Sequence, residues 1–375
     1  MTQTVLILGG SYAGLHITHH LLKHHPSDLK VILVSANSHF YWNMASVRAV
    51  VPEASIPDTQ LFAPLSTILA RYPSSSYELI ISTATASDFT SKTITLSDSR
   101  TIPYDHLVIA TGSRTASSPA NSHPTPWKAS GSYDSVLSLL HDLTTKVSAA
   151  SHIVVAGAGA TGCELAGELA FDNPQRQTRK EIVLLAADAD VLGGDSIAGS
   201  VGGELRKLGV QVRTDSRVET VRDGEGGQTE VVLVGGERIV TDLYLPTMGL
   251  VPNTEFVGGE FKDEGGRVLV DECFNVKGAE GVWAAGDVVG RPRCGFLITQ
   301  KQAGGVAKNI GAVLKGKQPA VVKGMPFDIF TCATGRSRAA GRMGAVKMLS
   351  IMAWAGKGRY LGLNYMAGYV DGSVA

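Results

Sequence analysis

A strand, a glycine-rich turn and a helix follow one another twice in this chain, about 150 residues apart. The first copy runs from the apolar strand 5–8 into the turn Gly9-Gly10-Ser11-Tyr12-Ala13-Gly14. The second runs from strand 153–156 into an intact GxGxxG formed by Gly157, Gly159 and Gly162. This order is typical of a dinucleotide-binding βαβ unit, because N–H groups at a helix N-terminus attract a pyrophosphate and small residues let it approach. One such turn is weak evidence, but its recurrence with strand and helix predicts two nucleotide sites.

Length and hydropathy allow two or three domains in the 375 residues. No apolar run reaches the roughly 18 residues that a spanning helix needs. The first apolar run follows no basic region and ends at glycines, and residue 2 is Thr, so neither a signal peptide nor a myristoylation site is predicted. We expect a cytoplasmic protein, with peripheral contact to a membrane left open.

The cysteines are too far apart in the sequence to form a CxxC or CxxxxC pair. Free thiols are therefore favoured over a zinc site or a redox disulfide between neighbouring cysteines, and no metal site is predicted.

Basic residues gather toward the end of the chain. From residue 291 onward there are thirteen Lys and Arg and two acids, although the whole chain has a formal net charge of zero. Such a segment can meet a phosphate-rich cofactor, an acidic membrane surface or nucleic acid, and it can equally pair with the acidic remainder of the same protein. Nucleic acid is the partner we do not expect.

Several residues beyond the first turn are candidates for a flavin nucleotide site. Ser35 ends the second strand, 30–34, at the place where a carboxylate usually holds a ribose. Arg48 is within reach of a phosphate, and the aromatics 40–42 either line the nucleotide or belong to the core. Gly286-Asp287 ends a later strand, and this carboxylate either holds the ribityl hydroxyls of a flavin or closes a turn.

The second unit does not select between NADH and NADPH, because Ala186 and Ala187 stand where an acid or an Arg would discriminate the ribose. Glu164 and Glu168 lie four residues apart on one helix face. Glu164 follows the third glycine, and we assign it to the nicotinamide or to the order of its pocket. The alternative is a solvated helix carboxylate.

Local patterns predict helices over 61–71, 136–147 and 299–314, and strands over 79–84, 93–96, 107–110, 182–185, 231–234 and 243–245. The segment 344–369 mixes apolar residues with Lys and Arg, and is read either as an interfacial membrane segment or as a helix packed on the flavin domain or a dimer partner.

Three further motifs occur in a fixed order between and after these units. They are Ala110-Thr111-Gly112, the GxxPNT of residues 249–254, and the AAGD of residues 284–287. With the two nucleotide units, they resemble the two-dinucleotide-binding flavoprotein superfamily, that of the pyridine nucleotide–disulfide oxidoreductases. The turn GGSYAG, the segment SHFYWN…VRA and the tail PFDIFTCATGRSRAAGRMG most resemble the branch of ferroptosis-suppressor and apoptosis-inducing-factor-like flavoproteins. Type II NADH dehydrogenases are more distant.

The resemblance implies an α/β fold with two Rossmann-like domains and a small C-terminal α+β region. FAD would bind in 1–115 with 246–324, NAD(P)H in 116–245, and 325–375 would form an interface, an acceptor site or a membrane contact. The FAD residues implied are Ser11 to Gly14, Arg48, Thr111, Gly112 and Asp287. The nicotinamide residues implied are Gly157, Gly159, Thr161, Gly162 and Gly249. Arg293, after Pro292, matches a basic residue near the flavin.

The chain departs from the family pattern at Ser11, which replaces a glycine, and at Ser35, which replaces the ribose acid. The missing cysteine pair excludes the usual disulfide-reductase branch, and the quinone-site glutamines of type II dehydrogenases have no counterpart.

Three functions follow. The favoured one is an FAD-dependent oxidoreductase that passes hydride from NADH or NADPH to flavin and on to a quinone-like acceptor. The second is a flavin-dependent tailoring oxidoreductase of a small metabolite. The third is a nucleotide-binding redox sensor or membrane module. No acid–base pair or nucleophile is required, so Glu164 and Arg293 are the only candidates near the reacting rings, and a homodimer remains possible.

Overall fold

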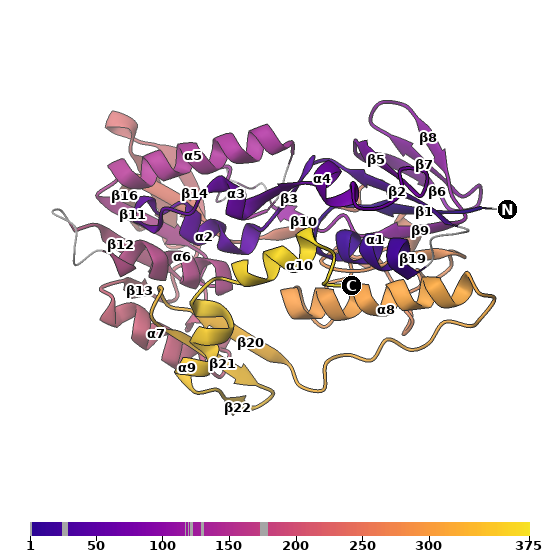
Figure 1. Ribbon diagram of the computed structural model, residues 1–375. Coiled ribbons are helices and arrows are strands. Elements are labelled where there is room, and N and C mark those ends of the chain that lie inside the picture. Colours follow the sequence, from indigo (N-terminus) through magenta and orange to yellow (C-terminus); the bar gives the residue numbers. More distant parts are fainter. Residues whose placement is uncertain are drawn as a thin grey trace.

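The computed structural model describes residues 2–24, 29–116, 118, 120, 123–128, 131–172 and 179–375. Its first sheet has five parallel strands in the order β19-β9-β1-β2-β5. These are β19 (Val282–Ala284), β9 (His106–Ile109), β1 (Gln3–Leu8), β2 (Leu29–Ser35) and β5 (Tyr77–Ile81). Helices α1 (Tyr12–His24) and α8 (Phe296–Val313) lie side by side on one face of this sheet (Figure 1). The other face packs on a separate buried cluster that includes Ile94, Phe256 and Val288.

The second sheet has four parallel strands in the order β13-β12-β11-β17. These are β13 (Gln211–Arg213), β12 (Glu181–Leu185), β11 (His152–Ala156) and β17 (Leu243–Pro246). Helices α5 (Tyr133–Ala149), α6 (Ala160–Phe171) and α7 (Ala198–Lys207) belong to this half, as do the antiparallel strands β14 (Val218–Asp223), β15 (Thr229–Leu233) and β16 (Arg238–Thr241). The chain passes between the two halves twice, once after β9 and once after β17. At these two passages β10 (Ser113–Thr115) and β18 (Leu250–Pro252) pair as antiparallel strands. The strands of the first sheet thus lie within the ranges expected to bind FAD. The strands of the second sheet lie within the range expected to bind NAD(P)H, except for Pro246, the last residue of β17.

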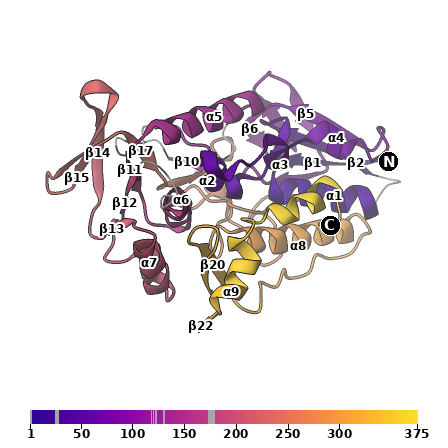
Figure 2. The same cartoon turned by 60° about the vertical axis from the view of Figure 1, so that its left-hand side comes forward.

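The end of the chain is built from short pieces. It contains β20 (Ile329–Ala333), β21 (Ala339–Met343), β22 (Val346–Lys347), α9 (Ser350–Ala353), a π turn at Trp354–Gly358, a 3₁₀ turn at Leu363–Tyr365 and α10 (Met366–Val370). This region runs from beside α6 to beside α1, and so bridges both halves (Figure 2). Segment 344–369 is not a single helix, and its last helix, α10, packs on α1 of the flavin half. Its interpretation as an interfacial membrane segment stays a prediction.

The predicted helix over 61–71 is interrupted. Helix α3 (Asp58–Leu61) ends where β4 (Phe62–Pro64) begins, and α4 (Leu65–Leu69) follows. Strand β4 pairs with β3 (His39–Tyr41). The cause is local, because Pro64 lacks an N–H and favours an extended residue before it, so the periodic apolar pattern cannot continue as one helix.

The predicted strand 79–84 is also two strands. Strand β5 ends at Ile81, and β6 (Ala84–Asp88) pairs in another sheet with β7 (Thr93–Leu96), which pairs with β8 (Thr101–Pro103). Other predicted elements are present, among them β2, β9, β11, β12, α5 and α8. The remaining short helix near the site is α2 (Ser46–Ala49).

Candidate functional site

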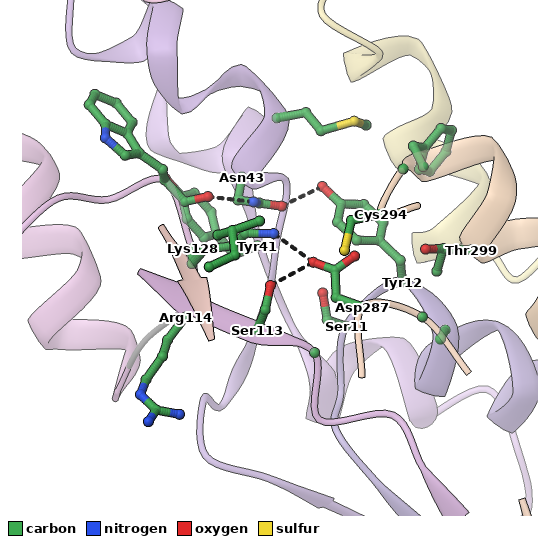
Figure 3. A pocket seen from close by; sticks show the side chains of 18 of the residues that line it. Ser11, Tyr12, Tyr41, Asn43, Ser113, Arg114, Lys128, Asp287, Cys294 and Thr299 are labelled. Carbon is green, nitrogen blue, oxygen red and sulfur yellow. Dashed lines mark hydrogen bonds and ion pairs between the residues drawn. The ribbon is translucent and has the colours of Figure 1, made fainter. Parts of the chain in front are cut away.

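One cavity of about 1100 Å³ lies between the two halves. Its walls come from the turn after β1, the turn after β11, the strand ends at 110–115 and 285–287, and the C-terminal region. Figure 3 shows one part of it, where side chains from segments far apart in the sequence converge. The carboxyl ends of parallel strands are where such folds bind their ligands, and both glycine turns follow a strand at that edge.

The first glycine turn packs so tightly that a side chain is excluded at Gly9 and at Gly14. Gly9 has φ +111° directly after β1, a conformation that L side chains rarely adopt. A Cβ on Gly14 would lie 1.8 Å from the carbonyl oxygen of Gly9. Helix α1 therefore starts directly against the strand, and the N–H groups of its first turn face the cavity, as a phosphate cradle requires.

The second turn repeats this geometry. Gly157 has φ +103°, and a Cβ on Gly162 would lie 1.8 Å from the carbonyl oxygen of Gly157. Gly159 caps α6 without a side-chain hydrogen bond, and nothing lies within 4 Å of where its Cβ would point. The N-terminus of α6 thus presents free space and unpaired donors to the cavity. The two cradles fit two pyrophosphates in the same way.

Most of the predicted site residues line the cavity. Those that do are Gly9, Gly10, Ser11, Tyr12, Ala13, Ser35, Thr111, Gly112, Gly157, Gly159, Thr161, Glu164, Gly249, Gly286, Asp287 and Arg293. Gly14 and Gly162 lie beneath the cradles, where they allow close packing of helix on strand. Arg48 is the exception.

Arg48 is not brought to the cavity wall, and its guanidinium is fully engaged elsewhere. Its Nε and Nη2 donate to the Glu168 carboxylate at 3.0 and 2.7 Å, and the group also donates to the carbonyls of Gly358 and Arg359. The structure therefore places Arg48 in an ion pair with Glu168 and not at the expected phosphate site. The side chain of Glu168 is wholly buried, so this residue is not a solvated helix carboxylate.

The end of β2 carries two polar side chains, those of Ser35 and Asn37. The Ser35 hydroxyl donates to the carbonyl of Asn37 at 2.7 Å, so it is already used within the loop. The Oδ1 of Asn37 accepts from the N–H of His39, whereas its buried Nδ2 has no partner among the residues that the structure describes. A buried donor without a partner is costly. Because Asn37 lines the cavity, this donor fits a ribose hydroxyl at the place where the family pattern has an acid.

Asp287 meets a lysine that the sequence did not reveal. Its Oδ2 accepts from the Ser113 hydroxyl and from Lys128 Nζ, both at 2.7 Å (Figure 3). Burial alone would raise the pKa of this carboxyl, but Lys128 and Ser113 outweigh burial and lower the pKa below its ordinary value. The carboxylate is therefore kept charged inside the cavity, as an acceptor for hydroxyl groups. Burial beside Asp287 raises the pKa of the neighbouring Cys294 thiol to about 11, so this cysteine stays protonated.

The segment around Lys128 is fixed by three neighbours. The Tyr41 hydroxyl donates to the carbonyl of Pro126, Asn43 donates to the carbonyl of Trp127, and the Trp127 indole donates to the carbonyl of Pro246. The loop predicted over 116–126 lies partly outside the described residues.

Glu164 faces the cavity with a partner from the C-terminal region. Lys357 Nζ lies 2.6 Å from Glu164 Oε1, and the same oxygen accepts from the N–H of Ala333 at 3.1 Å. Burial lowers the pKa of Lys357, but Glu164 more than offsets burial, so the pKa is raised and the lysine stays charged. Glu164 is therefore held in one orientation beside the second cradle and is not a solvated helix carboxylate.

Arg293 also lines the cavity, and it is anchored on its far side. Its Nη2 donates to Asp328 at 2.6 Å and to the carbonyl of Ile329 at 2.9 Å, and its guanidinium lies over the Phe330 ring at 5.0 Å. That Arg293 lies near the flavin ring remains a prediction. Among the described residues, no three His, Cys, Asp or Glu side chains gather as a metal site would require, and no helix there is long and apolar enough to cross a bilayer.

Comparison with known proteins agrees with this geometry. The family model "Pyridine nucleotide-disulphide oxidoreductase" matches residues 3–304. "Oxidoreductase ptaL" of Pestalotiopsis fici is 37% identical over 353 residues, which cover 92% of each chain. "Ferroptosis suppressor protein 1" of Xenopus tropicalis is 25% identical over 312 residues, 80% of this chain and 76% of that one.

Among solved structures, the sulfide:quinone oxidoreductase of Aquifex aeolicus superposes with a TM-score of 0.78 at 16% identity, over 99% of this chain and 92% of that chain. This likeness concerns the fold, which is the predicted α/β fold with two Rossmann-like domains. Members of the matched family use FAD with NADH or NADPH, the two cofactors expected here. The chain belongs to the pyridine nucleotide-disulphide oxidoreductase family of flavin-dependent oxidoreductases.

Proposed function

We propose that this oxidoreductase passes hydride from NADH or NADPH by way of FAD to a quinone-like acceptor. In the overall reaction, NAD(P)H, one proton and a quinone give NAD(P)⁺ and a hydroquinone. The observation that carries the proposal is the single cavity that includes both phosphate cradles and continues to an apolar wall. Two redox rings held in one cavity can lie in contact, and contact is what hydride transfer needs.

FAD, when bound, supplies a carrier that accepts a hydride and releases two electrons. The chain's own residues hold the two nucleotides and orient them. The first cradle takes the FAD pyrophosphate, with Asn37 at the ribose and Asp287 at the ribityl chain. The second cradle takes the nicotinamide nucleotide, with Glu164 fixed by Lys357 beside it.

An apolar part of the cavity lining suits a flat, apolar acceptor. Met348, Met352, Leu361, Phe296 and Tyr365 form this apolar wall. Apolar and polarizable side chains exclude water and adapt to a ring of variable substitution. In this proposal the proton taken up with a quinone comes from solvent.

An exposed apolar patch adjoins that wall. Leu349 and Ile351 are 69% and 68% exposed, and Met352 is both 55% exposed and part of the cavity lining. Lys347 lies next to them in the region of basic excess. An apolar patch with adjacent cations is suited to an anionic bilayer, where a lipid-soluble quinone resides. We infer a peripheral membrane contact through this patch.

Steady-state oxidation of NADH and NADPH with a panel of acceptors tests the function. We expect quinones to turn over faster than ferricyanide-type dyes of matched potential or small metabolites. Turnover confined to a non-quinone metabolite would replace the proposal with a tailoring oxidoreductase, and tight nucleotide binding without turnover would indicate a redox sensor.

Co-sedimentation with vesicles that contain anionic lipid tests the membrane contact. The variant Leu349→Ser with Ile351→Ser should lose binding. The matched control, Val234→Ser with Val240→Ser, alters two apolar residues that are 61% and 53% exposed in the other half of the molecule and should bind as the unmodified protein does. Equal binding by all three proteins contradicts the proposed contact.

A further inference from the structure

Residues 358–372, here called the strap, are held by side chains of the flavin half through the strap's backbone. The Arg48 guanidinium donates to the carbonyls of Gly358 at 2.7 Å and Arg359 at 2.8 Å, and the Trp42 indole donates to the carbonyl of Leu361 at 2.9 Å. Gly358 is the last residue of the π turn, and Arg359 and Leu361 follow it. The first end of the strap is thus fixed by donors around residues 42–48.

The second end is fixed in the same way at the C-terminus of α10. His19 Nε2 lies 2.8 Å from the carbonyl oxygen of Tyr369, and Arg71 donates to the carbonyls of Val370 at 2.7 Å and Asp371 at 2.5 Å. Lys23 donates to the carbonyl of Gly372. The last carbonyls of a helix have no partner within it and carry the negative end of its dipole, so cations are favoured there. Here Lys23 belongs to α1, and Arg71 stands just after α4.

The strap is also a wall of the cavity on the side of the first cradle. Leu361, Gly362 and Tyr365 line the cavity together with Tyr12, which belongs to the first glycine turn. The Tyr369 ring stacks on Phe40 at 4.9 Å and meets Tyr12 edge-on at 5.7 Å. The strap therefore covers the space beside the first cradle while its own grip lies outside the cavity.

The residues that hold the second end of the strap are not residues that line the cavity. Arg71 and Lys23 touch the strap but do not line the cavity. Between the two grips, Gly362 has φ +76° and lies against Trp42. A segment that is held at both ends through its carbonyls can swing away about one end when the grip at the other end is lost, and it then carries the Tyr365 and Tyr369 rings with it.

We propose that the strap is a closure over the flavin side of the cavity, and that its release by the second grip is what lets FAD leave. FAD stays bound as long as Arg71, Lys23 and His19 hold the carbonyls of 369–372. The inference concerns cofactor retention, and it does not depend on which acceptor the enzyme uses.

The test uses the FAD-loaded full chain and two measurements. Hydrogen exchange followed by mass spectrometry reports on the strap, and the recovery of flavin fluorescence after dilution reports the rate of FAD release. The variant Arg71→Ala with Lys23→Ala should exchange faster in 358–372 and release FAD about tenfold faster. The conservative variant Arg71→Lys with Lys23→Arg keeps a donor at each place and should restore most of the retention.

A matched control removes two cations elsewhere in the chain. Arg217→Ala with Lys315→Ala alters two exposed residues outside both the strap and the cavity lining, and it should match the unmodified protein in both measurements. Faster exchange of the strap with an unchanged rate of FAD release would overturn the closure, and unchanged exchange would overturn the grip. A chain that takes up no FAD would contradict the cofactor assignment, and the exchange comparison would then still decide the grip.

Discussion

Arg48 and Glu168 form an ion pair of two parallel hydrogen bonds, 2.7 and 3.0 Å long, and the side chain of Glu168 has no exposed surface. The pair joins α2 of the flavin half to α6 of the nicotinamide half. Arg336, from the C-terminal region, lies 3.4 Å from the same carboxylate. Burial raises the pKa of Glu168 even though Arg48 opposes that shift. All three parts of the molecule thus meet at one carboxylate.

Removing one member of this pair should be costly for stability. Arg48→Met leaves a buried carboxylate with only the more distant Arg336, and we expect a loss of about 3 kcal/mol in the free energy of unfolding. Urea unfolding followed by circular dichroism measures it. Lys30→Met is the control, because the Lys30–Glu78 pair is about 40% exposed at both side chains and should contribute less than about 1 kcal/mol. Equal losses for the two variants would show that the buried pair has no special weight.

Stability should fall in mild acid because of His19. Burial is the main cause that lowers its pKa to about 4 from the ordinary 6.5, although the Tyr369 carbonyl opposes this. Between these two values the unfolded chain binds the proton and the folded chain does not. The contribution of His19 is therefore complete above about pH 6.5 and decreases as the pH falls toward 4, by about 3 kcal/mol in total.

Denaturant unfolding at a series of pH values checks this. His19→Gln should have a shallower decline across that window, whereas His141→Gln, whose side chain is 56% exposed, should keep the full decline. An unchanged slope in His19→Gln would contradict the assignment.

FAD affinity should depend on the two polar groups that the cavity keeps ready. Asp287→Asn removes the charged acceptor, and Asn37→Leu removes the unpaired donor. We expect each to weaken FAD binding about tenfold to a hundredfold, since hydrogen bonds to buried groups are worth roughly 1–3 kcal/mol. Fluorescence titration of the flavin-stripped protein measures the dissociation constant, with Asp142→Asn as a surface control. Affinities equal to that of the control would remove both residues from the FAD site.

Glu164 and Lys357 should act as one unit. Each of Glu164→Gln and Lys357→Met is expected to slow the reduction of the flavin by NAD(P)H about tenfold, because either change leaves the other group unpaired. The double variant should be no slower than the single ones. Stopped-flow absorbance under anaerobic conditions gives the rates. Effects that multiply in the double variant would show that the two residues act independently.

The two cradles could be predicted from sequence because their physics is local. A strand, tight glycines and a helix lie within twenty residues, and both copies have the geometry expected for Gly9 and Gly157. Glu164 lines the cavity beside the second cradle, because its position relative to the third glycine is fixed by one helix turn. Its assignment to the nicotinamide stays a prediction.

The role of Arg48 could not be read from the same evidence. Its partners are Glu168, 120 residues away, and carbonyls more than 300 residues away. Backbone carbonyls leave no trace in the sequence, so neither this contact nor the grip of Arg71 on residues 370–371 has a local signal. Lys128 was missed for a similar reason, since it stands in a loop with no periodic pattern and meets Asp287 only in the fold.

The most direct test of the central claim is an anaerobic titration of the FAD-loaded protein. We expect NADH or NADPH to bleach the flavin absorbance near 450 nm (about the position for oxidised flavin), and a stoichiometric quinone to restore it. Flavin that stays oxidised with both nucleotides, or reduced flavin that no quinone reoxidises, would contradict the account.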